Sequence, residues 1–443
     1  MAEFSAIKSV KHALVDTTTK HDESFLAQLG PGLITGAADD DPSGIATYSQ
    51  VGAQFGFSML WLIFFSIPLM AGIQEICGRL GRITGRGLAA NLSKSYSKTL
   101  VRSLVLLLFL ANIFNLGADI SAMSTGLQLV AGGNVIAYAL LFGVVSLLLQ
   151  VYVPYTRYAH YLKWLTWALF AYVITAFVVH VPWGRALAAT IVPSISLQRE
   201  YLMALVAVLG TTISPYLFFW QTSQEVEEVR VNRNESPLKR KPFQAFRQFR
   251  RIAIDTRVGM VFSNVVAFFI ILTAAATLHN AASSNRIQTA ADAAKALQPL
   301  AGNFAFLLFA IGIVGTGMLA IPVLAGSAAY AVSETFGWRA SLESKPHNAR
   351  KFYDVIAIAT LLGIGFNLLG FDPIRALFWS ALVNGIVAVP LMFLLMLISM
   401  NSAIVGKFRL PLHLRVAGWA ATVLMAAASL AFIWTALQDA LSA

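Results

Sequence analysis

Charged residues are scarce in this chain of 443 residues: Asp, Glu, Lys and Arg together make up 12% of it. A soluble protein carries roughly 25% charged residues. Hydrophobic residues account for 57% of the chain, and its mean hydropathy is +0.69. This composition excludes a soluble enzyme, a disordered chain and a nucleic-acid-binding domain. It predicts an all-α polytopic membrane protein, because the apolar runs are continuous and too long to be the alternating strands of a β-barrel.

Cysteine is almost absent. The single Cys77 excludes an intramolecular disulfide and a cysteine metal cluster, and we expect it to pack inside an apolar helix. Residues 1–25 are polar and contain no apolar stretch that ends in a cleavage site. We therefore expect a cytoplasmic tail here and no signal peptide. No residue pattern predicts a bound cofactor.

A helix needs roughly 20 apolar residues to cross a bilayer, and eleven apolar runs meet this need. They span residues 26–53, 57–80, 101–131, 134–153, 160–181, 200–223, 255–278, 301–333, 352–370, 373–400 and 413–437.

The positive charges are distributed unevenly between the loops. If the N-terminus and every second loop are placed on one side, that side holds 27 of the 32 Lys and Arg residues. The positive-inside rule then predicts a multi-pass protein of the inner (plasma) membrane, with a cytoplasmic N-terminus and an external C-terminus. We interpret the basic loop 230–257 as a cytoplasmic topology signal near anionic lipid and not as a nucleic-acid site.

Three consecutive carboxylates interrupt the first span, LGPGLITGAADDDPSGIATYSQVGAQFG. Asp39, Asp40 and Asp41 stand in its middle, and a charge at the bilayer centre costs at least about 2.5–3.5 kcal/mol. One interpretation is a surface turn between two short helices, but it would place the N-terminal lysines outside, against the charge bias. The other is a discontinuous membrane helix, because Pro42 lacks the N–H of a continuous helix and disfavours helical geometry at the residue before it.

A broken helix offers a site to hard cations, because unwound backbone frees carbonyl oxygens beside a carboxylate. Successive helical residues point about 100° apart, so the three Asp residues cannot all face one ion. We predict that Asp41, next to the break, binds the ion near the open backbone at Gly44. Asp39 and Asp40 then line the approach or bond to neighbouring helices.

The sixth span carries a matching interruption, GTTISPY, at residues 210–216. Spans 1 and 6 hold equivalent places in two five-helix halves, 26–181 and 200–400. Paired interruptions of this kind are the best sequence indication of a transporter's binding site. An odd number of spans in each half requires the halves to be inverted. Residues 413–443 then form an eleventh helix and the external C-terminus.

Further polar residues lie inside the spans. Asn112, Asn115 and Asp119 share one face of the third span. We expect isolated Asn residues such as Asn112, Asn264 and Asn384 to form hydrogen bonds between helices. Asp119 has no evident intramembrane Lys or Arg partner, so a place on the ion path, together with Asn115, is as well supported as a structural role.

Two acidic groups lie near cytoplasmic helix ends. Glu75 and Arg79 are one turn apart, and we expect them to form an ion pair. We expect Glu225, Glu227 and Glu228 to form a solvated acidic cluster that faces the basic loop.

These motifs resemble those of the Nramp divalent-metal transporters over most of spans 1 to 10. GPGLITGAADDDPSG resembles the family's first helix, which begins G-P-G and breaks at Asp-Pro-Gly-Asn. TTISPY resembles its sixth-helix Met-Pro-His segment, and QEICGRLGRITGRGLAANL is also Nramp-like. The resemblance implies the LeuT-type fold, with inverted five-helix repeats, discontinuous helices 1 and 6, and alternating access around them.

Carried over by position, the family's metal-binding Asp is Asp41, and its backbone-carbonyl position is Thr211. The family's Asn falls on Gly44, its Met on Ser214 and its His on Tyr216. The combination of Asp-Pro-Ser-Gly with Ile-Ser-Pro-Tyr resembles the Nramp-related magnesium transporters. That branch implies transport of Mg²⁺ and Mn²⁺ without proton coupling.

The loss of the family's Met and Asn ligands favours a harder cation on physical grounds. A thioether suits softer metals than Mg²⁺, whereas a roomier site lined by oxygen suits Mg²⁺, which keeps several waters. Asp41 would supply the counter-charge, and Thr211, Ser214 and the carbonyls near Gly44 and Gly210 would act largely through water. Loss of the histidine removes a group that titrates near neutral pH.

Three other functions share some of these features. A proton-coupled Mn²⁺/Fe²⁺ importer has the same fold but a sulfur ligand where Ser214 stands. An intramembrane enzyme of the prenyltransferase kind, which holds Mg²⁺-diphosphate, needs carboxylates one helical turn apart and a second facing cluster. A carrier of organic solutes would hold a substrate carboxylate at a half-helix N-terminus, where three Asp residues would repel it. We therefore predict a transporter and not an enzyme.

Overall fold

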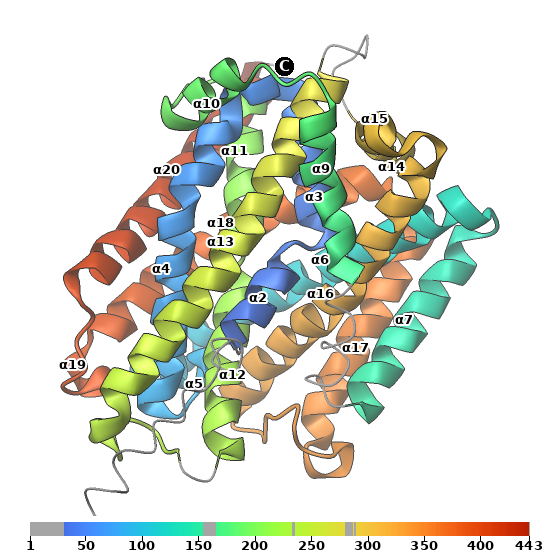
Figure 1. Cartoon of the computed structure of the whole chain (residues 1–443). Helices are drawn as coiled ribbons and strands as arrows, with labels where there is room; N and C mark the ends of the chain where they lie inside the picture. Colours follow the sequence, from blue (N-terminus) through green and yellow to red (C-terminus); the bar gives the residue numbers. More distant parts are fainter. Residues whose placement is uncertain (1–30, 154–164, 233–234, 280–286, 288, 443) are drawn as a thin grey trace, which may run out of the picture.

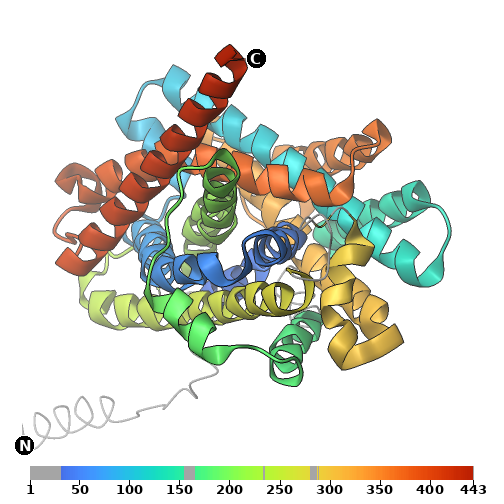
Figure 2. The same ribbon diagram turned by 90° about the horizontal axis from the view of Figure 1, so that it is seen from above.

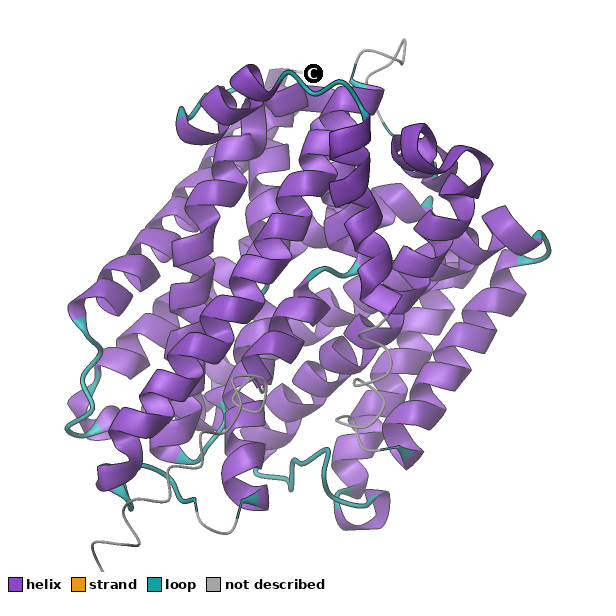
Figure 3. Ribbon diagram, viewed as in Figure 1, coloured by secondary structure: helices purple, strands orange, loops and turns teal. Residues whose placement is uncertain are grey.

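The computed structural model describes residues 31–153, 165–232, 235–279, 287 and 289–442, and their regular structure is helical throughout (Figure 3). The longer helices are α2 (Pro31–Asp39), α3 (Pro42–Phe55), α4 (Leu60–Thr84), α6 (Lys98–Ala131), α7 (Val135–Tyr152), α9 (Phe170–Val178), α11 (Arg199–Thr212), α12 (Pro215–Val231), α13 (Ala245–Leu278), α16 (Ala305–Phe336), α17 (Arg350–Phe366), α18 (Pro373–Met400) and α20 (Leu412–Ser442).

Short helices and 3₁₀ turns connect them. They are η2 (Gly56–Met59), α5 (Leu88–Ser95), η3 (Leu165–Leu169), α10 (Trp183–Ile191), η4 (Pro242–Gln244), α14 (Ala290–Ala294), η5 (Lys295–Leu297), α15 (Gln298–Ala301), η6 (Gly302–Phe304), η7 (Pro346–Asn348), η8 (Asn367–Leu369) and α19 (Ser402–Val405).

The helices agree with the expected spans. Nine stretches of the described residues are long and apolar enough to cross a membrane. Two differences separate this number from the eleven expected. The first span is divided, so that α2 stands apart and α3 joins α4 in one stretch, Pro42–Thr84. The fifth appears as the shorter apolar helix Trp167–Val178, and residues 160–164 of that expected span lie outside the described residues. The expected tail, 1–25, also lies outside them.

The connecting elements gather at two opposite ends of the bundle (Figure 1). α5 and α19 share one end with the last turns of α12, while α10, α14, α15 and the C-terminus lie at the other end. Seen from above, α20 lies on the outside of the bundle (Figure 2), where it packs on α4, α11 and α18. The outer helices α7 and α20 expose apolar side chains such as Leu140, Leu148 and Leu430, as a lipid-facing surface requires.

Glycines let the central helices approach closely. A side chain at Gly36 on α2 would overlap the backbone of Gly259 on α13. A side chain at Gly210 on α11 would overlap the backbone of Gly385 on α18. Small residues at such crossings are typical of membrane helix packing, and they fix the two broken helices against α13 and α18.

The expected ion pair between Glu75 and Arg79 is confirmed. Arg79 Nη2 lies 2.7 Å from Glu75 Oε1. Arg257, from α13, adds a second contact at 3.2 Å to the other oxygen of Glu75.

The expectation of a solvated acidic cluster is wrong for two of its three members. Glu225 and Glu227 are buried, and only Glu228 is partly exposed. The reason is Arg82, a buried side chain of α4, which lies 2.7 Å from both Glu225 and Glu228. Arg251 of α13 pairs with the same two carboxylates. The cluster does face basic residues, but as a buried network that joins α4, α12 and α13.

Glu227 belongs to a different group of contacts. Its carboxylate accepts hydrogen bonds from Tyr330 Oη at 3.1 Å and from Ser341 Oγ at 2.9 Å. These bonds attach the last turns of α12 to α16 and to the chain that follows it.

Glu235, in the connection between α12 and α13, extends the Arg82 network. It pairs with Arg82 and accepts a hydrogen bond of 2.8 Å from Gln248. Burial alone would raise the pKa of Glu235, but Arg82, Gln248 and Arg251 together outweigh it and hold the pKa below its ordinary value. Because this folded-state pKa is lowered, the stabilisation is present above the unfolded pKa of about 4.3 and is lost as the pH falls through the lowered value.

We predict that Arg82→Gln lowers the free energy of unfolding by about 3–5 kcal/mol, because it leaves the buried Glu225 without its main partner. The matched control is Arg199→Gln, whose partner Asp439 is exposed, and which is expected to cost less than about 1 kcal/mol. The measurement is the thermal unfolding midpoint of detergent-solubilised protein by fluorescence-detected size exclusion. Equal midpoints for the two variants would contradict the role assigned to the network.

Candidate metal-ion site

The first membrane helix is interrupted at Asp41. α2 ends at Asp39, and α3 begins at Pro42 with Asp41 as its N-cap in extended backbone geometry. Asp41 Oδ1 accepts hydrogen bonds from the backbone N–H of Gly44 at 2.8 Å and from Ser43 Oγ at 2.6 Å. The three carboxylates are at most 2% exposed. The alternative of a surface turn is therefore wrong.

The sixth membrane helix is interrupted in the same way. α11 ends at Thr212, and α12 begins at Pro215 after the non-helical residues Ile213 and Ser214. Ser214 Oγ lies 3.0 Å from the carbonyl oxygen of Gly210 and 2.9 Å from that of Thr211. The Ser214 hydroxyl thus turns back onto its own helix, towards the carbonyl oxygens of Gly210 and Thr211, two residues that the sequence proposed for the site.

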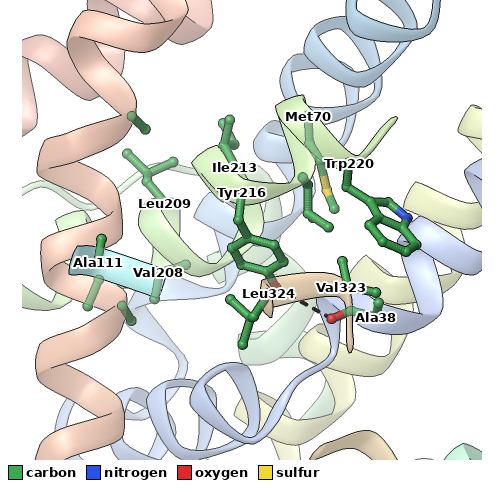
Figure 4. Close-up of a cluster of buried hydrophobic side chains, with 14 of the residues drawn as sticks. Ala38, Met70, Ala111, Val208, Leu209, Ile213, Tyr216, Trp220, Val323 and Leu324 are labelled. Atoms are coloured by element: carbon green, nitrogen blue, oxygen red, sulfur yellow. Dashed lines mark hydrogen bonds between the residues drawn. The ribbon is translucent and has the colours of Figure 1, made fainter. Parts of the chain in front are cut away.

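The two interruptions meet in the centre of the bundle. α2 packs on α12 and α3 packs on α11, so the two broken helices run in opposite directions with their breaks at one level. Tyr216, in the first turn of α12, reaches across: its Oη is 3.4 Å from the carbonyl oxygen of Ala38 and 3.3 Å from Asp41 Oδ2. Figure 4 shows the Tyr216 ring directed at Ala38 within a cluster of buried apolar side chains.

Asn115 brings a third element to the site. From α6 it donates Nδ2–H to Asp41 Oδ2 at 3.1 Å, and its Oδ1 accepts a hydrogen bond of 2.8 Å from Ser380 of α18. Asn115, which the sequence indicated as a candidate for the ion path, thus contacts Asp41 in the structure, and its role towards an ion stays a prediction. With Ser43, Gly44 and Tyr216, it gives the Asp41 carboxylate four donors.

Asp119 lies one turn further along α6 and is fully buried. The backbone N–H of Ser43 faces its carboxylate, but neither oxygen completes a hydrogen bond of ordinary geometry within the described residues. Among those residues it has no ion-pair partner, as the sequence indicated. Asp119 therefore stands beside the break, next to the start of α3.

The remaining Asn residues behave differently from one another. Asn112 bonds to the Leu324 carbonyl at 3.0 Å and to Ser327 at 2.8 Å, which confirms an interhelical role. Asn264 also forms an interhelical hydrogen bond, which it accepts from Ser66 of α4 at 3.0 Å. Asn384 on α18 has no hydrogen-bond partner for its side chain in the described part of the chain.

Asp39 and Asp40 bond to a neighbouring helix, as one of the two alternatives predicted. Both carboxylates contact Ser263 Oγ of α13, at 2.9 and 3.0 Å. Sequence reasoning missed Ser263, although its neighbour Asn264 was noticed. It also missed Tyr48, whose buried hydroxyl faces Thr211 Oγ1.

Gly44 marks the open side of the break. Thr211 Oγ1 lies 3.2 Å, and the carbonyl oxygen of Asp39 3.5 Å, from the point that a Cβ of Gly44 would occupy. Oxygen atoms from both broken helices thus border the space left by the missing side chain. Among the described residues, however, no three His, Cys, Asp or Glu side chains form a group that could hold a metal ion.

Membrane-length helices, two of them broken at one level around buried carboxylates, define a secondary membrane transporter. The family model described as "Natural resistance-associated macrophage protein-like" matches residues 32–435. The chain therefore belongs to the Nramp family, as its motifs suggested, and it is a transporter and not an enzyme.

Individual relatives agree with this assignment. The "Divalent metal cation transporter MntH" of Mycobacterium leprae is 24% identical over 441 residues, covering 95% of each chain. The protein of the same name from Klebsiella pneumoniae is 25% identical over 409 residues and covers 89% of this chain and 90% of its own.

Solved structures show the same fold. The Eremococcus coleocola manganese transporter superposes with a TM-score of 0.73 at 16% identity, covering 94% of this chain and 88% of its own. The nucleobase-cation symporter Mhp1 gives a TM-score of 0.57 at 14% identity, covering 93% of each chain.

We predict that Asn115→Leu weakens binding of Mn²⁺, the ion named for the solved relative, by about tenfold to a hundredfold, the range for residues that position a ligand. The substitution removes the Asn115 N–H that donates to Asp41 and the Asn115 oxygen that accepts a hydrogen bond from Ser380. Isothermal titration calorimetry measures the affinity. Asn112→Leu is the matched control, because it removes comparable interhelical bonds without touching Asp41. Equal losses of affinity in both variants would show that Asn115 acts only through stability.

Proposed function

We propose that the protein transports divalent metal cations across the inner (plasma) membrane by alternating access, and that Mg²⁺ and Mn²⁺ are its cargo. The observation that carries the proposal is the Asp41 carboxylate at the junction of two broken helices, bordered by oxygen and nitrogen donors from α3, α6 and α12. The relatives named as divalent metal cation transporters, and the solved manganese transporter, support divalent cations as the cargo.

The preference for a hard cation follows from the residue types at the two breaks. Ser214 stands where the family resemblance places a methionine, and Gly44 where it places an asparagine. Soft thioether ligands favour later transition metals, whereas carboxylate, hydroxyl and carbonyl oxygens favour Mg²⁺ and Mn²⁺. Mg²⁺ keeps several of its waters and needs only one or two carboxylates, so Asp41 with Thr211 and nearby carbonyl oxygens would hold it largely through water.

Transport without proton coupling is the second part of the proposal. Tyr216 stands where the resemblance places a histidine, and a phenol does not titrate near neutral pH. The membrane potential alone suffices to drive uptake: two positive charges that cross about 100 mV gain roughly 4.6 kcal/mol.

The proposal includes the architecture that alternating access requires. Residues 26–181 and 200–400 would be two inverted five-helix repeats, and 413–443 would form the eleventh helix with an external C-terminus. The N-terminal tail, 1–25, would be cytoplasmic. The equivalent breaks of α2–α3 and α11–α12 support this arrangement, as does the concentration of Lys and Arg in alternate loops.

The second candidate is a proton-coupled Mn²⁺/Fe²⁺ importer on the same fold. The solved manganese transporter favours it, and so do relatives at 24–25% identity that carry the MntH name. The two candidates differ in the sulfur ligand, which Ser214 does not supply, and in whether protons move with the metal.

The test is uptake of Mg²⁺ and Mn²⁺ into proteoliposomes, with and without a pH gradient, for the wild type and for Asp41→Asn. We expect potential-driven uptake of both ions that is independent of the pH gradient, and a decrease of at least about a hundredfold in Asp41→Asn because the buried counter-charge is lost. Acidification of the lumen driven by metal uptake would establish the proton-coupled importer instead. Uptake of Mn²⁺ alone, without competition from Mg²⁺, would overturn the hard-cation preference.

We predict that Ser214→Met shifts selectivity towards softer ions. A thioether at the break adds a ligand that Mg²⁺ does not use, so the ratio of Cd²⁺ to Mg²⁺ affinity is expected to rise by about tenfold or more, the equivalent of about 1.4 kcal/mol. Competition binding on purified protein measures the ratio. Ser327→Met, on α16, is the matched control and should leave the ratio unchanged. An unchanged ratio in Ser214→Met would show that this position does not face the ion.

A further inference from the structure

Four buried carboxylates stand close to the first break, and within the described residues none of them has a basic partner. Asp39, Asp40, Asp41 and Asp119 are all at most 2% exposed. The ion pairs of the described residues involve none of them. Because a buried charge is very costly without compensation, these carboxylates favour either a proton or a cation that the described residues do not supply.

The donors are divided very unequally among these carboxylates. Asp41 has four donors, whereas among the described residues Asp39 and Asp40 share a single donor, Ser263 Oγ, at 2.9 and 3.0 Å. A serine hydroxyl carries one hydrogen and can donate it to only one acceptor at full strength. Asp39 Oδ1 and Asp40 Oδ2 have no hydrogen-bond partner within the described residues.

A separate side chain completes the polar surroundings. Tyr48, in the second turn of α3, is fully buried, and its hydroxyl lies within electrostatic reach of the carboxylates of Asp39, Asp40 and Asp41. The hydroxyl faces Thr211 Oγ1, but neither group completes a hydrogen bond of ordinary geometry among the described residues. Unsatisfied buried polar groups of this kind require a partner that the side chains around them do not supply.

We propose that Asp39 and Asp40, joined by Ser263, form a second subsite for the divalent cation, on the α13 side of the break. This inference rests on the proposed transport of divalent cations, and it adds a second cation-binding position to the one at Asp41. Asp41 faces α6 and α12 through Asn115 and Tyr216, whereas the Asp39–Asp40 pair faces α13. The break would therefore offer the ion two binding positions, one at Asp41 and one between Asp39 and Asp40.

The chemistry of the subsite favours a hard divalent cation. Two carboxylates and hydroxyl oxygens are ligands that Mg²⁺ and Mn²⁺ accept. A divalent ion also neutralises both carboxylates at once, which a monovalent ion cannot do. The Gly36–Gly259 contact holds α2 tightly on α13, so Asp39, the last residue of α2, and Asp40 after it are held next to Ser263.

The experiment measures Mn²⁺ binding to the purified full-length protein by electron paramagnetic resonance of the free ion, starting from Asp41→Asn. We expect this variant to retain one weakened Mn²⁺ site. Adding Asp39→Asn and Asp40→Asn should remove that residual binding. Adding Ser263→Ala, a milder change, should weaken it by about tenfold to a hundredfold. Adding Ser327→Ala, a buried serine of α16 without a carboxylate partner, should leave it unchanged.

The outcomes separate the two proposals. If the wild type binds neither Mn²⁺ nor Mg²⁺, the proposed function fails and the subsite fails with it. If the wild type binds Mn²⁺ but Asp41→Asn binds none, the second subsite alone is overturned. Residual binding that survives removal of both carboxylates would also overturn it, because the ion would then lie elsewhere.

Discussion

The site depends on one constraint: a carboxylate inside a membrane protein loses its hydrating water, and this loss is costly unless hydrogen-bond donors, a proton or a cation compensate for it. Asp41 meets this constraint by standing between α2 and α3 and capping the N-terminus of α3. Pro42 makes the arrangement possible, because it removes one backbone donor and forces extended geometry before it. The Gly44 N–H then becomes available to the side chain, and Asn115 and Tyr216 complete the shell from α6 and α12.

The second broken helix brings polar groups of α11 and α12 next to Asp41. Since α11 and α12 cross α3 and α2 in the opposite direction, the ends of four half-helices converge at one level. The close contact of Gly210 with Gly385 holds α11 on α18 in the same way that Gly36 holds α2 on α13. The polar centre is thus surrounded by tightly packed helices, and the buried Arg82 network fixes the base of α12 to α4 and α13.

Much of this could be read from the sequence, and the reasons are physical. Hydropathy located the membrane helices, and Pro42 and Pro215 located both breaks, because proline has a strong local effect. Spacing along α6 placed Asn115 on the same face as Asp119, and this face meets the break at Asp41. Contacts between distant helices were not accessible in this way. Ser263 is an ordinary residue in an apolar run, and only the packing of α2 on α13 reveals its role. Glu225 looked solvated because its partner, Arg82, lies 143 residues earlier in the chain.

The capping role of Asp41 has a consequence for how firmly cargo is held. Oδ1 of Asp41 caps the N-terminus of α3 through the Gly44 N–H, and an N-cap contributes about 1 kcal/mol to its helix. An ion that drew Oδ1 away from the Gly44 N–H would remove this cap and fray the first turn of α3. The helix would regain the capping energy when the ion left. If Asp41 binds the cargo as proposed, this cost lowers the affinity by about the energy of the cap and so favours release.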